Sequence, residues 1–233
     1  MKAEEAILQF KGVSRVYHQG GETITALNAV SLTLKKGEFV ALAGPSGSGK
    51  TTLLNVAAGL DQPTAGKVWI RDHEITAMAS HELTHLRLEE IGFIFQAYNL
   101  VPVLSAEENA ELILLLRGLP EAKRKEIVHR VLKEVGMAGL EKRRPSELSG
   151  GQQQRVAIAR AIAAEPAFVL ADEPTANLDS ETALNLLKLM KKLNQEHSMT
   201  FLFSTHDPHV MRLANRVVYL VDGRIDRDES QDT

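Results

Sequence analysis

The 233-residue sequence contains no cysteine, and its longest apolar run, at 112–116, is short. The missing thiol excludes a disulfide framework, a thiolate metal site and a cysteine nucleophile, and it suits a reducing compartment. A membrane span needs about 20 consecutive apolar residues, so no helix of the chain is expected to cross a bilayer. The acidic start, Met1 to Glu5, lacks the apolar core of a secretion signal.

An excess of positive charge is also missing. Lys and Arg number 27 and Asp and Glu 30, so the formal net charge is −3. Proteins dedicated to nucleic acid are usually basic, and nucleic acid is therefore not expected as a partner. The remaining composition, 44% hydrophobic and 24% charged, is that of an ordinary soluble globular protein.

The first part of the chain has sequence patterns that are typical of β-strands. Short apolar or alternating runs predict strands at 7–10, 13–18, 23–27, 31–34 and Phe39–Ala43. Glycine-containing segments at 19–22 and 35–38 predict hairpin turns, because glycine supplies positive φ. After Ala43 the apolar spacing becomes helical, and Gly59 predicts where that helix ends.

The remainder of the chain predicts an α/β core with a helical insertion. Strands are expected at 67–70, 91–95, Phe168–Ala171, 200–204 and 217–221. Helices are expected at 106–117, 121–135, 151–164 and 180–196, and the polar residues 226–233 are expected to be frayed.

The segment after the strand Phe39–Ala43 fits the phosphate-loop pattern G-x-x-x-x-G-K-[ST]. It comprises Gly44, Pro45, Ser46, Gly47, Ser48, Gly49, Lys50 and Thr51. The glycines let successive N–H groups face inward, and the following helix N-terminus favours a polyphosphate. Lys50 adds a charge for the outer phosphates, and the Thr51 hydroxyl suits Mg²⁺. Thr52, next on the helix, completes the expected nucleotide-binding set.

Two carboxylates follow the apolar strand Phe168–Ala171. A continuously apolar run suits a buried parallel strand, and ligands gather at the carboxyl ends of such strands. Asp172 is then expected in the Mg²⁺ shell, and Glu173 is expected to orient the attacking water. The alternative is a solvated acidic turn.

A second glycine-rich element, residues 148–152, precedes a helix. Ser149 and Gln152 have the spacing of a capping box around Gly150 and Gly151, and the capped N-terminus forms a second anion site. The alternative is a well-capped helix without further function.

These three elements occur in the order and spacing of ATP-binding-cassette (ABC) ATPases, a family that the chain resembles over essentially its whole length. The resemblance implies that Tyr17 stacks on adenine and that Gln96 senses Mg²⁺ and the attacking water. It also implies that His206 contacts the γ-phosphate and that the loop carrying Asp179 crosses to a partner subunit. The alternatives are that Tyr17 packs within a hairpin, that Gln96 and His206 are loop residues, and that Asp179 is a helix cap.

The family implies a P-loop NTPase with a RecA-like core, an N-terminal antiparallel β-subdomain and an inserted α-helical subdomain. Residues 1–233 are then one nucleotide-binding domain: about 1–95 and 165–233 form the core, and about 96–164 the helical subdomain. Two copies pack head to tail around two MgATP, so that Ser149, Gly150, Gly151 and Gln152 of one copy reach the nucleotide bound by Lys50 of the other. The catalytic set is Lys50, Gln96, Glu173 and His206, and Mg²⁺ is assigned to Thr51, Gln96 and Asp172.

The residues around Gln96, together with 152–161, are similar to the branch that serves lipoprotein release and macrolide efflux. This similarity implies an ATPase subunit on the cytoplasmic face of the inner membrane that drives a separate permease by mechanotransmission. The apolar residues Tyr98, Leu100, Val101 and Leu104 are expected at the permease contact, unless they pack inside the helical subdomain. The alternatives are a regulatory ATPase of a cell-division-type complex, and a soluble cassette acting on ribosomes or DNA.

One motif points to different chemistry. His81, Glu82 and His85 match the H-E-x-x-H zinc pattern. A catalytic zinc site needs a third protein ligand, which the sequence does not offer at the usual distance, so no zinc is expected.

Overall fold

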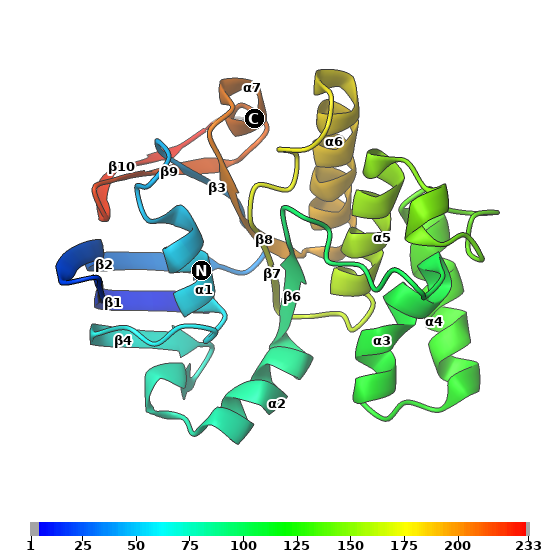
Figure 1. Ribbon diagram of the computed structural model, residues 1–233, viewed down its shortest axis with the longest axis horizontal. Coiled ribbons are helices and arrows are strands. Elements are labelled where there is room, and N and C mark those ends of the chain that lie inside the picture. Colours follow the sequence, from blue (N-terminus) through cyan, green and yellow to red (C-terminus); the bar gives the residue numbers. More distant parts are fainter. Residues whose placement is uncertain (1–4, 232–233) are drawn as a thin grey trace.

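The computed structural model describes residues 5–231, which form two β-sheets with helices around them (Figure 1). The first sheet has the order β2-β1-β4-β5 and is antiparallel. Its strands are β1 (Ala6–Gln19), β2 (Glu22–Lys35), β4 (Ala65–Ile70) and β5 (His73–Glu74).

The second sheet has the order β10-β9-β3-β8-β7-β6 and is parallel except for its edge strand β10. Its strands are β3 (Phe39–Ala43), β6 (Ile91–Ile94), β7 (Phe168–Ala171), β8 (Thr200–Thr205), β9 (Arg216–Val221) and β10 (Arg224–Ser230). The central strands β3, β7 and β8 are buried along their whole length, as expected for parallel strands covered on both faces.

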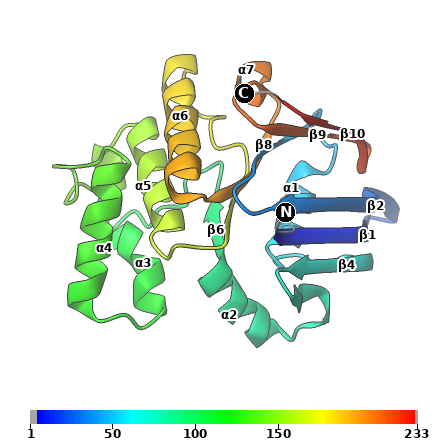
Figure 2. The ribbon, with the colours of Figure 1, turned by 180° about the vertical axis from the view of Figure 1, so that it is seen from behind.

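Some helices flank this second sheet, and others form a separate group at one end of the molecule (Figures 1 and 2). They are α1 (Lys50–Ala57), α2 (Ser80–Glu90), α3 (Ala106–Leu116), α4 (Glu121–Glu134), α5 (Gly150–Ile162), α6 (Ser180–His197) and α7 (Pro208–Met211). Two short 3-10 helices, η1 (Ile75–Ala77) and η2 (Pro145–Glu147), connect longer elements. In the described part of the chain, no helix has both the length and the apolarity needed to span a membrane.

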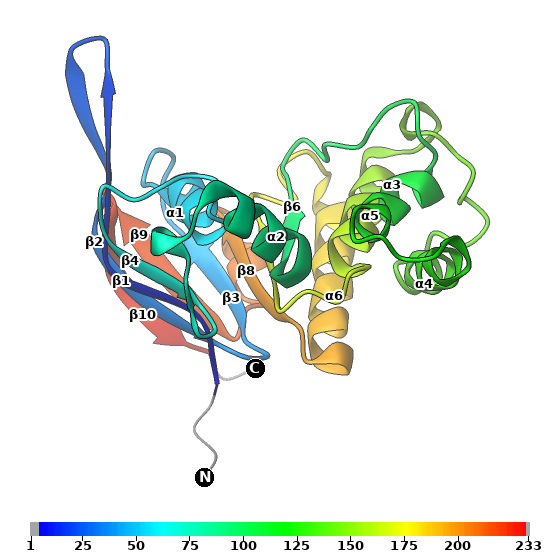
Figure 3. The same ribbon diagram turned by 90° about the horizontal axis from the view of Figure 1, so that it is seen from below.

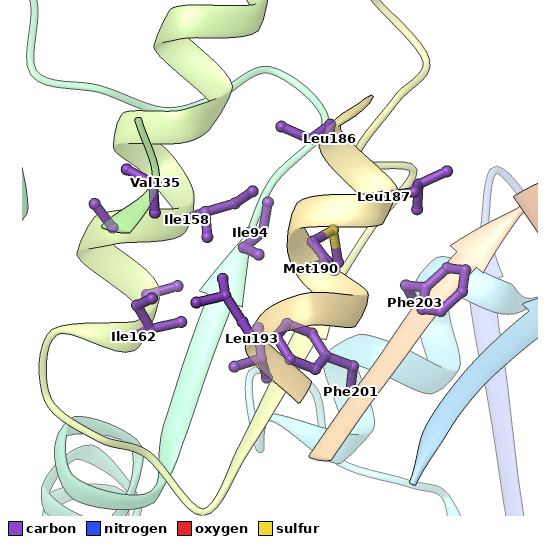
Figure 4. Packing of buried hydrophobic residues seen from close by; sticks show 14 of the residues in the cluster. Ile94, Val135, Ile158, Ile162, Leu186, Leu187, Met190, Leu193, Phe201 and Phe203 are labelled. Atoms are coloured by element: carbon purple, nitrogen blue, oxygen red, sulfur yellow. The ribbon is translucent and has the colours of Figure 1, made fainter. Parts of the chain in front are cut away.

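Alternate residues of the parallel strands face two different hydrophobic cores. Phe201 and Phe203 of β8 pack with α5 and α6, as Figure 4 shows for Met190 and Leu193. Leu202, between the two phenylalanines, faces the other core, which contains α1 and the antiparallel sheet. Successive side chains point to opposite faces because a strand is pleated. Both α1 and α6 can therefore pack against the same sheet.

The structure confirms most of the elements expected from the sequence. The structure has the expected α/β core with an antiparallel β-sheet at the start and a helical insertion. Strand β7 has the predicted bounds, and α3 to α6 agree with prediction to within two residues at either end. Gly20 and Gly21 form the predicted two-residue hairpin turn, both with positive φ. Gly59 follows the end of α1 as predicted, with a φ of 60°.

Three expectations were wrong. The segment 35–38 is not a hairpin: β2 and β3 lie in different sheets, and these residues carry the chain between them. The predicted pairs of short strands at the start are two continuous strands, because register shifts absorb the irregular residues. Residues 226–230 are not frayed but belong to β10, where Asp228 pairs with Arg216 of β9 through two bonds of 2.7 Å.

Candidate nucleotide-binding site

The phosphate loop lies between β3, at the centre of the parallel sheet, and the start of α1. Two of its glycines are required by close contacts as well as by positive φ. A Cβ at Gly44 would lie 2.1 Å from the carbonyl oxygen of Leu220, and one at Gly49 would lie 2.3 Å from that of Ala26. Neighbouring strands therefore fix the path of the loop, and only glycine fits at these two positions.

The Lys50 side chain lies across this loop. Its Nζ donates to the carbonyl oxygens of Gly44 at 2.9 Å and Pro45 at 2.8 Å, and the residue is only 6% exposed. Gly49 caps α1 without a side-chain bond, so the first N–H groups of the helix have no side-chain acceptor from the capping residue. A buried ammonium and a helix N-terminus together attract a polyphosphate anion.

Asp172 and Thr51 meet at the carboxyl ends of β7 and β3. The Thr51 hydroxyl donates to Asp172 Oδ1 at 3.2 Å, across 121 residues of sequence. The same Oδ1 accepts a hydrogen bond of 2.7 Å from Ser204, the penultimate residue of β8. These are hard oxygen donors, the ligand type that Mg²⁺ prefers.

Glu173 follows Asp172 in the left-handed backbone conformation, with a φ of 42°. This conformation is strained for a residue with a side chain, and a hydrogen bond from the backbone N–H of Glu173 holds it. The Glu173 N–H donates to Ser204 Oγ at 2.8 Å, so one hydroxyl connects both carboxylate residues. The Glu173 carboxylate in turn lies 3.3 Å from His206 Nδ1. Both side chains line a pocket of 170 Å³ between β8 and the start of α6.

Gln96 and Asp179 lie in loops around this centre. Gln96 is exposed just beyond β6, and its carbonyl oxygen accepts a 2.9 Å hydrogen bond from the Asn177 side chain. Asp179 caps α6 by accepting from the Thr182 N–H at 3.0 Å, and its hydrogen bonds with Thr182 lower the pKa of the Asp179 carboxyl. The predicted capping role of Asp179 is thus present in the structure.

The second glycine-rich element also forms the predicted cap. Ser149 Oγ accepts from the Gln152 N–H at 3.3 Å, and the Gln152 side chain accepts from the Ser149 N–H at 2.9 Å. Gly150 faces the Tyr98 hydroxyl, which would lie 2.9 Å from a Cβ at this position. All three ribbon views place α1 and α5 on opposite sides of the strands β6 to β8 (Figures 1–3). One chain therefore does not bring its capped α5 to its own phosphate loop.

Tyr17 lies on β1, where its hydroxyl donates to Asp61 Oδ2 and Arg15 covers one face of its ring. The zinc-like motif lies on α2, where His85 Nε2 lies 3.5 Å from the Glu89 carboxylate. Among residues 5–231, the group of acidic and histidine side chains close enough to share an ion includes neither His81 nor His85.

Two site residues were missed by the sequence analysis. Ser204, which contacts both carboxylate residues, lay inside a predicted strand, and a polar residue ending an apolar run was its only signal. Gln154, one of three adjacent glutamines, is fully buried and donates to the Pro174 carbonyl oxygen at 2.8 Å. Nothing in the sequence distinguishes it from its neighbours.

The geometry of the site and the comparisons with known proteins together define the class of protein. A family model described as ABC transporter matches residues 27–176, and the chain belongs to this family of P-loop ATPases. It is 46% identical over 227 residues to the uncharacterized ATP-binding protein MJ0796 of Methanocaldococcus jannaschii, covering 96% of this chain and 97% of that one. It is 42% identical to the lipoprotein-releasing ATP-binding protein LolD of Chromohalobacter salexigens, covering 96% and 94%.

Two further comparisons extend the likeness. The macrolide export ATP-binding/permease protein MacB of Mannheimia succiniciproducens is 42% identical over 94% of this chain, which spans 34% of that longer protein. A solved structure of MJ0796, described as a dimeric post-hydrolysis state bound to ADP and Pi, superposes with a TM-score of 0.89 at 43% identity. It covers 97% of this chain and 99% of its own.

Proposed function

We propose that the chain is the ATP-hydrolysing subunit of a transporter, which dimerises around two MgATP and drives a separate membrane permease. The observation that carries this proposal is the continuous set of contacts from Thr51 through Asp172 and Ser204 to Glu173 and His206. It lies at the carboxyl ends of parallel strands, where α/β proteins place their ligands.

Each residue has a distinct part in this reaction. Lys50 and the N–H groups from Gly44 to Thr52 hold the phosphates, and Tyr17 stacks on the base. Glu173 orients a water molecule towards the γ-phosphate and accepts a proton from that water. His206, whose Nδ1 lies 3.3 Å from the Glu173 carboxylate, contacts the same phosphate. Positioned charges of this kind provide most of the catalysis in phosphoryl transfer.

Thr51 and Asp172 fit a magnesium ion because a hydroxyl and a carboxylate already lie 3.2 Å apart. Gln96 completes the proposed set from the loop after β6. An ion held there would supply positive charge against the charge that develops on the phosphates.

The second half of each site comes from another copy. Ser149, Gly150, Gly151 and Gln152 form a helix N-terminus that α5 holds away from the phosphate loop of its own chain (Figure 1). In a head-to-tail pair they reach the partner's nucleotide, and Asp179 lies in the crossing loop. The dimeric MJ0796 structure supports this arrangement. We assign residues of about 1–95 and 165–233 to the core and about 96–164 to the helical subdomain.

In this proposal the chain lies on the cytoplasmic face of the inner membrane, and the movement that it passes to the permease serves lipoprotein release or efflux. The LolD and MacB relatives support this branch. Of the four apolar residues expected at this contact, Val101 is 36% accessible, whereas Tyr98, Leu100 and Leu104 are partly buried and Leu100 packs against the core. Val101 and the neighbouring Val103, which is 69% accessible, offer an apolar contact for the permease.

Purified protein tests the ATPase proposal. Lys50→Ala is expected to lose ATP binding, whereas Glu173→Gln is expected to bind ATP, hydrolyse it poorly and accumulate as a dimer. Lys191→Ala is the matched control, because Lys191 also donates to a backbone carbonyl, that of Leu213 at 2.8 Å, but outside the site. Wild-type turnover by Glu173→Gln would remove Glu173 from its role.

The coupling proposal needs a membrane partner. Co-expression with a candidate membrane permease is expected to yield a complex whose ATPase activity responds to the permease. A partner with a cell-division role and no transported substrate would favour the regulatory alternative.

A further inference from the structure

Tyr17 lies in a part of β1 that pairs with only one neighbouring strand. The ladder between β1 and β4 ends at Ser14 and Ala65, and beyond this point β1 pairs only with β2. The two strands continue as a hairpin that projects from the body of the molecule (Figure 3). A two-stranded ribbon is only marginally stable by itself, so a stacking residue on it needs additional support.

The segment that follows α1 provides this support. Thr64 donates from its N–H to the Ser14 carbonyl at 2.8 Å, and its hydroxyl accepts from the Val16 N–H at 3.0 Å. Asp61 lies in the same segment and accepts the hydrogen bond of the Tyr17 hydroxyl. The N–H of Asp61 is itself bound to the Asn55 carbonyl of α1 at 3.2 Å. The Tyr17 ring is thereby attached to the helix that begins with Lys50.

Arg15 completes the arrangement. It forms a two-point contact with Asp61, with Nε 3.0 Å from Oδ2 and Nη2 2.7 Å from Oδ1. The guanidinium carbon lies 4.5 Å from the centre of the Tyr17 ring and covers one of its faces. A planar, forked cation suits both contacts at once, which a lysine cannot make.

We infer that Arg15 and Asp61 are positioning residues for nucleotide binding, which lock Tyr17 so that only its uncovered face accepts a base. This inference rests on the proposed function. Because Asp61 connects to α1, the residue that stacks on the base and the residues that bind the phosphates belong to one rigid unit. Little conformational entropy is then lost when the nucleotide binds. The ligand that benefits is a nucleotide with a flat aromatic base, and a base-free polyphosphate gains nothing.

Calorimetric titration with ADP and with inorganic pyrophosphate tests the inference. Asp61→Ala, Asp61→Asn and Tyr17→Phe are compared with the wild type. Loss of base stacking altogether costs roughly tenfold or more in affinity, so loosening of the ring is expected to weaken ADP binding about 3- to 10-fold. Pyrophosphate binding is expected to stay within about twofold. The double variant Tyr17→Phe/Asp61→Ala is expected to bind ADP no more weakly than Asp61→Ala alone, because Asp61→Ala already removes the Tyr17–Asp61 hydrogen bond.

Arg71→Ala is the matched control, because it breaks the Arg71–Glu90 ion pair at 3.2 Å just beyond β4, away from Tyr17. It is expected to bind both ligands as the wild type does. Equal weakening of ADP and pyrophosphate by the Asp61 variants, or unchanged ADP binding, would overturn the inference. A wild-type protein that binds neither ATP nor ADP would instead overturn the proposed function, so the two failures are distinguishable.

Discussion

The buried side chain of Gln154 donates a 2.8 Å hydrogen bond to the carbonyl oxygen of Pro174. Gln154 lies on α5, five residues beyond Ser149, and Pro174 directly follows Glu173. One hydrogen bond therefore connects the helix whose N-terminus is proposed to reach the partner's nucleotide with the turn that carries the proposed catalytic carboxylate.

Gln154→Leu is expected to impair turnover more than nucleotide binding. The substitution keeps the volume but leaves the Pro174 carbonyl unbound, so the strained backbone of Glu173 can relax. Misplacement of a catalytic group by about 1 Å costs up to roughly 100-fold, and we expect kcat to fall about 10- to 100-fold with the Kd for ATP nearly unchanged.

Gln153→Leu serves as the control for this prediction. Gln153 is the preceding residue of α5 and donates to the Leu148 carbonyl at 3.1 Å, within the same group of helices. It is expected to retain most of its turnover. Equal loss of kcat in both variants would show that Gln154 acts only by stabilising α5.

Ser204→Ala removes the hydroxyl that donates to Asp172 and accepts from the Glu173 N–H. Because the Asp172 carboxylate and the Glu173 backbone each lose a hydrogen bond, we expect kcat to fall about 10- to 100-fold and the Mg²⁺ concentration for half-maximal turnover to rise. Thr200→Val at the opposite end of β8 removes another buried hydroxyl, which accepts from the Gly37 N–H at 2.9 Å. It is expected to cost about 1 kcal/mol of stability and to leave the Mg²⁺ requirement unchanged.

The predictions of the fold succeeded where a segment specifies its own structure and failed where a partner does. The apolar run of β7 and the capping box of Ser149 are local signals, and both have the predicted form. The polar strand β10 carries no such signal. Its ladder with β9 and the Arg216–Asp228 contact stabilise it, and neither is visible in residues 226–230 alone.

The same distinction applies to the site. The phosphate loop and Asp172 could be proposed as site residues because each lies in a local sequence motif, and the structure brings Thr51 to Asp172. Ser204, Gln154 and Asp61 were not predictable, because each acts on a residue that is distant in sequence and adjacent only after folding. The residues proposed to bind the nucleotide lie in local motifs, whereas the residues that hold them in position do not.

Asn109 is expected to control the rigidity of the apolar loop after Gln96. This fully buried side chain accepts from the Val101 N–H at 2.7 Å and donates to the carbonyls of Val101, Leu104 and Ser105. Asn109→Ala leaves these buried groups unbound and is expected to cost about 2–3 kcal/mol, or roughly 5–10 °C in Tm. Hydrogen exchange is expected to rise in the loop, and unchanged exchange there would contradict the prediction.

Glu108 gives the N-terminus of α3 a pH dependence with a definite sign. The Ser105 N–H donates to its carboxylate at 2.7 Å, and this backbone hydrogen bond, with a contribution from the Ser105 side chain, lowers the pKa of Glu108. The stabilisation is therefore fully present above the unfolded-state pKa, about 4.3, and is lost as the pH falls through the lower folded-state pKa. Glu108→Gln is expected to lower stability at neutral pH by less than about 1 kcal/mol, because the group is exposed. Urea unfolding of both proteins from about pH 7 downward should show that the difference between their free energies of unfolding decreases in acid. A difference independent of pH would contradict the prediction, because it would mean that the charge of Glu108 does not stabilise the cap.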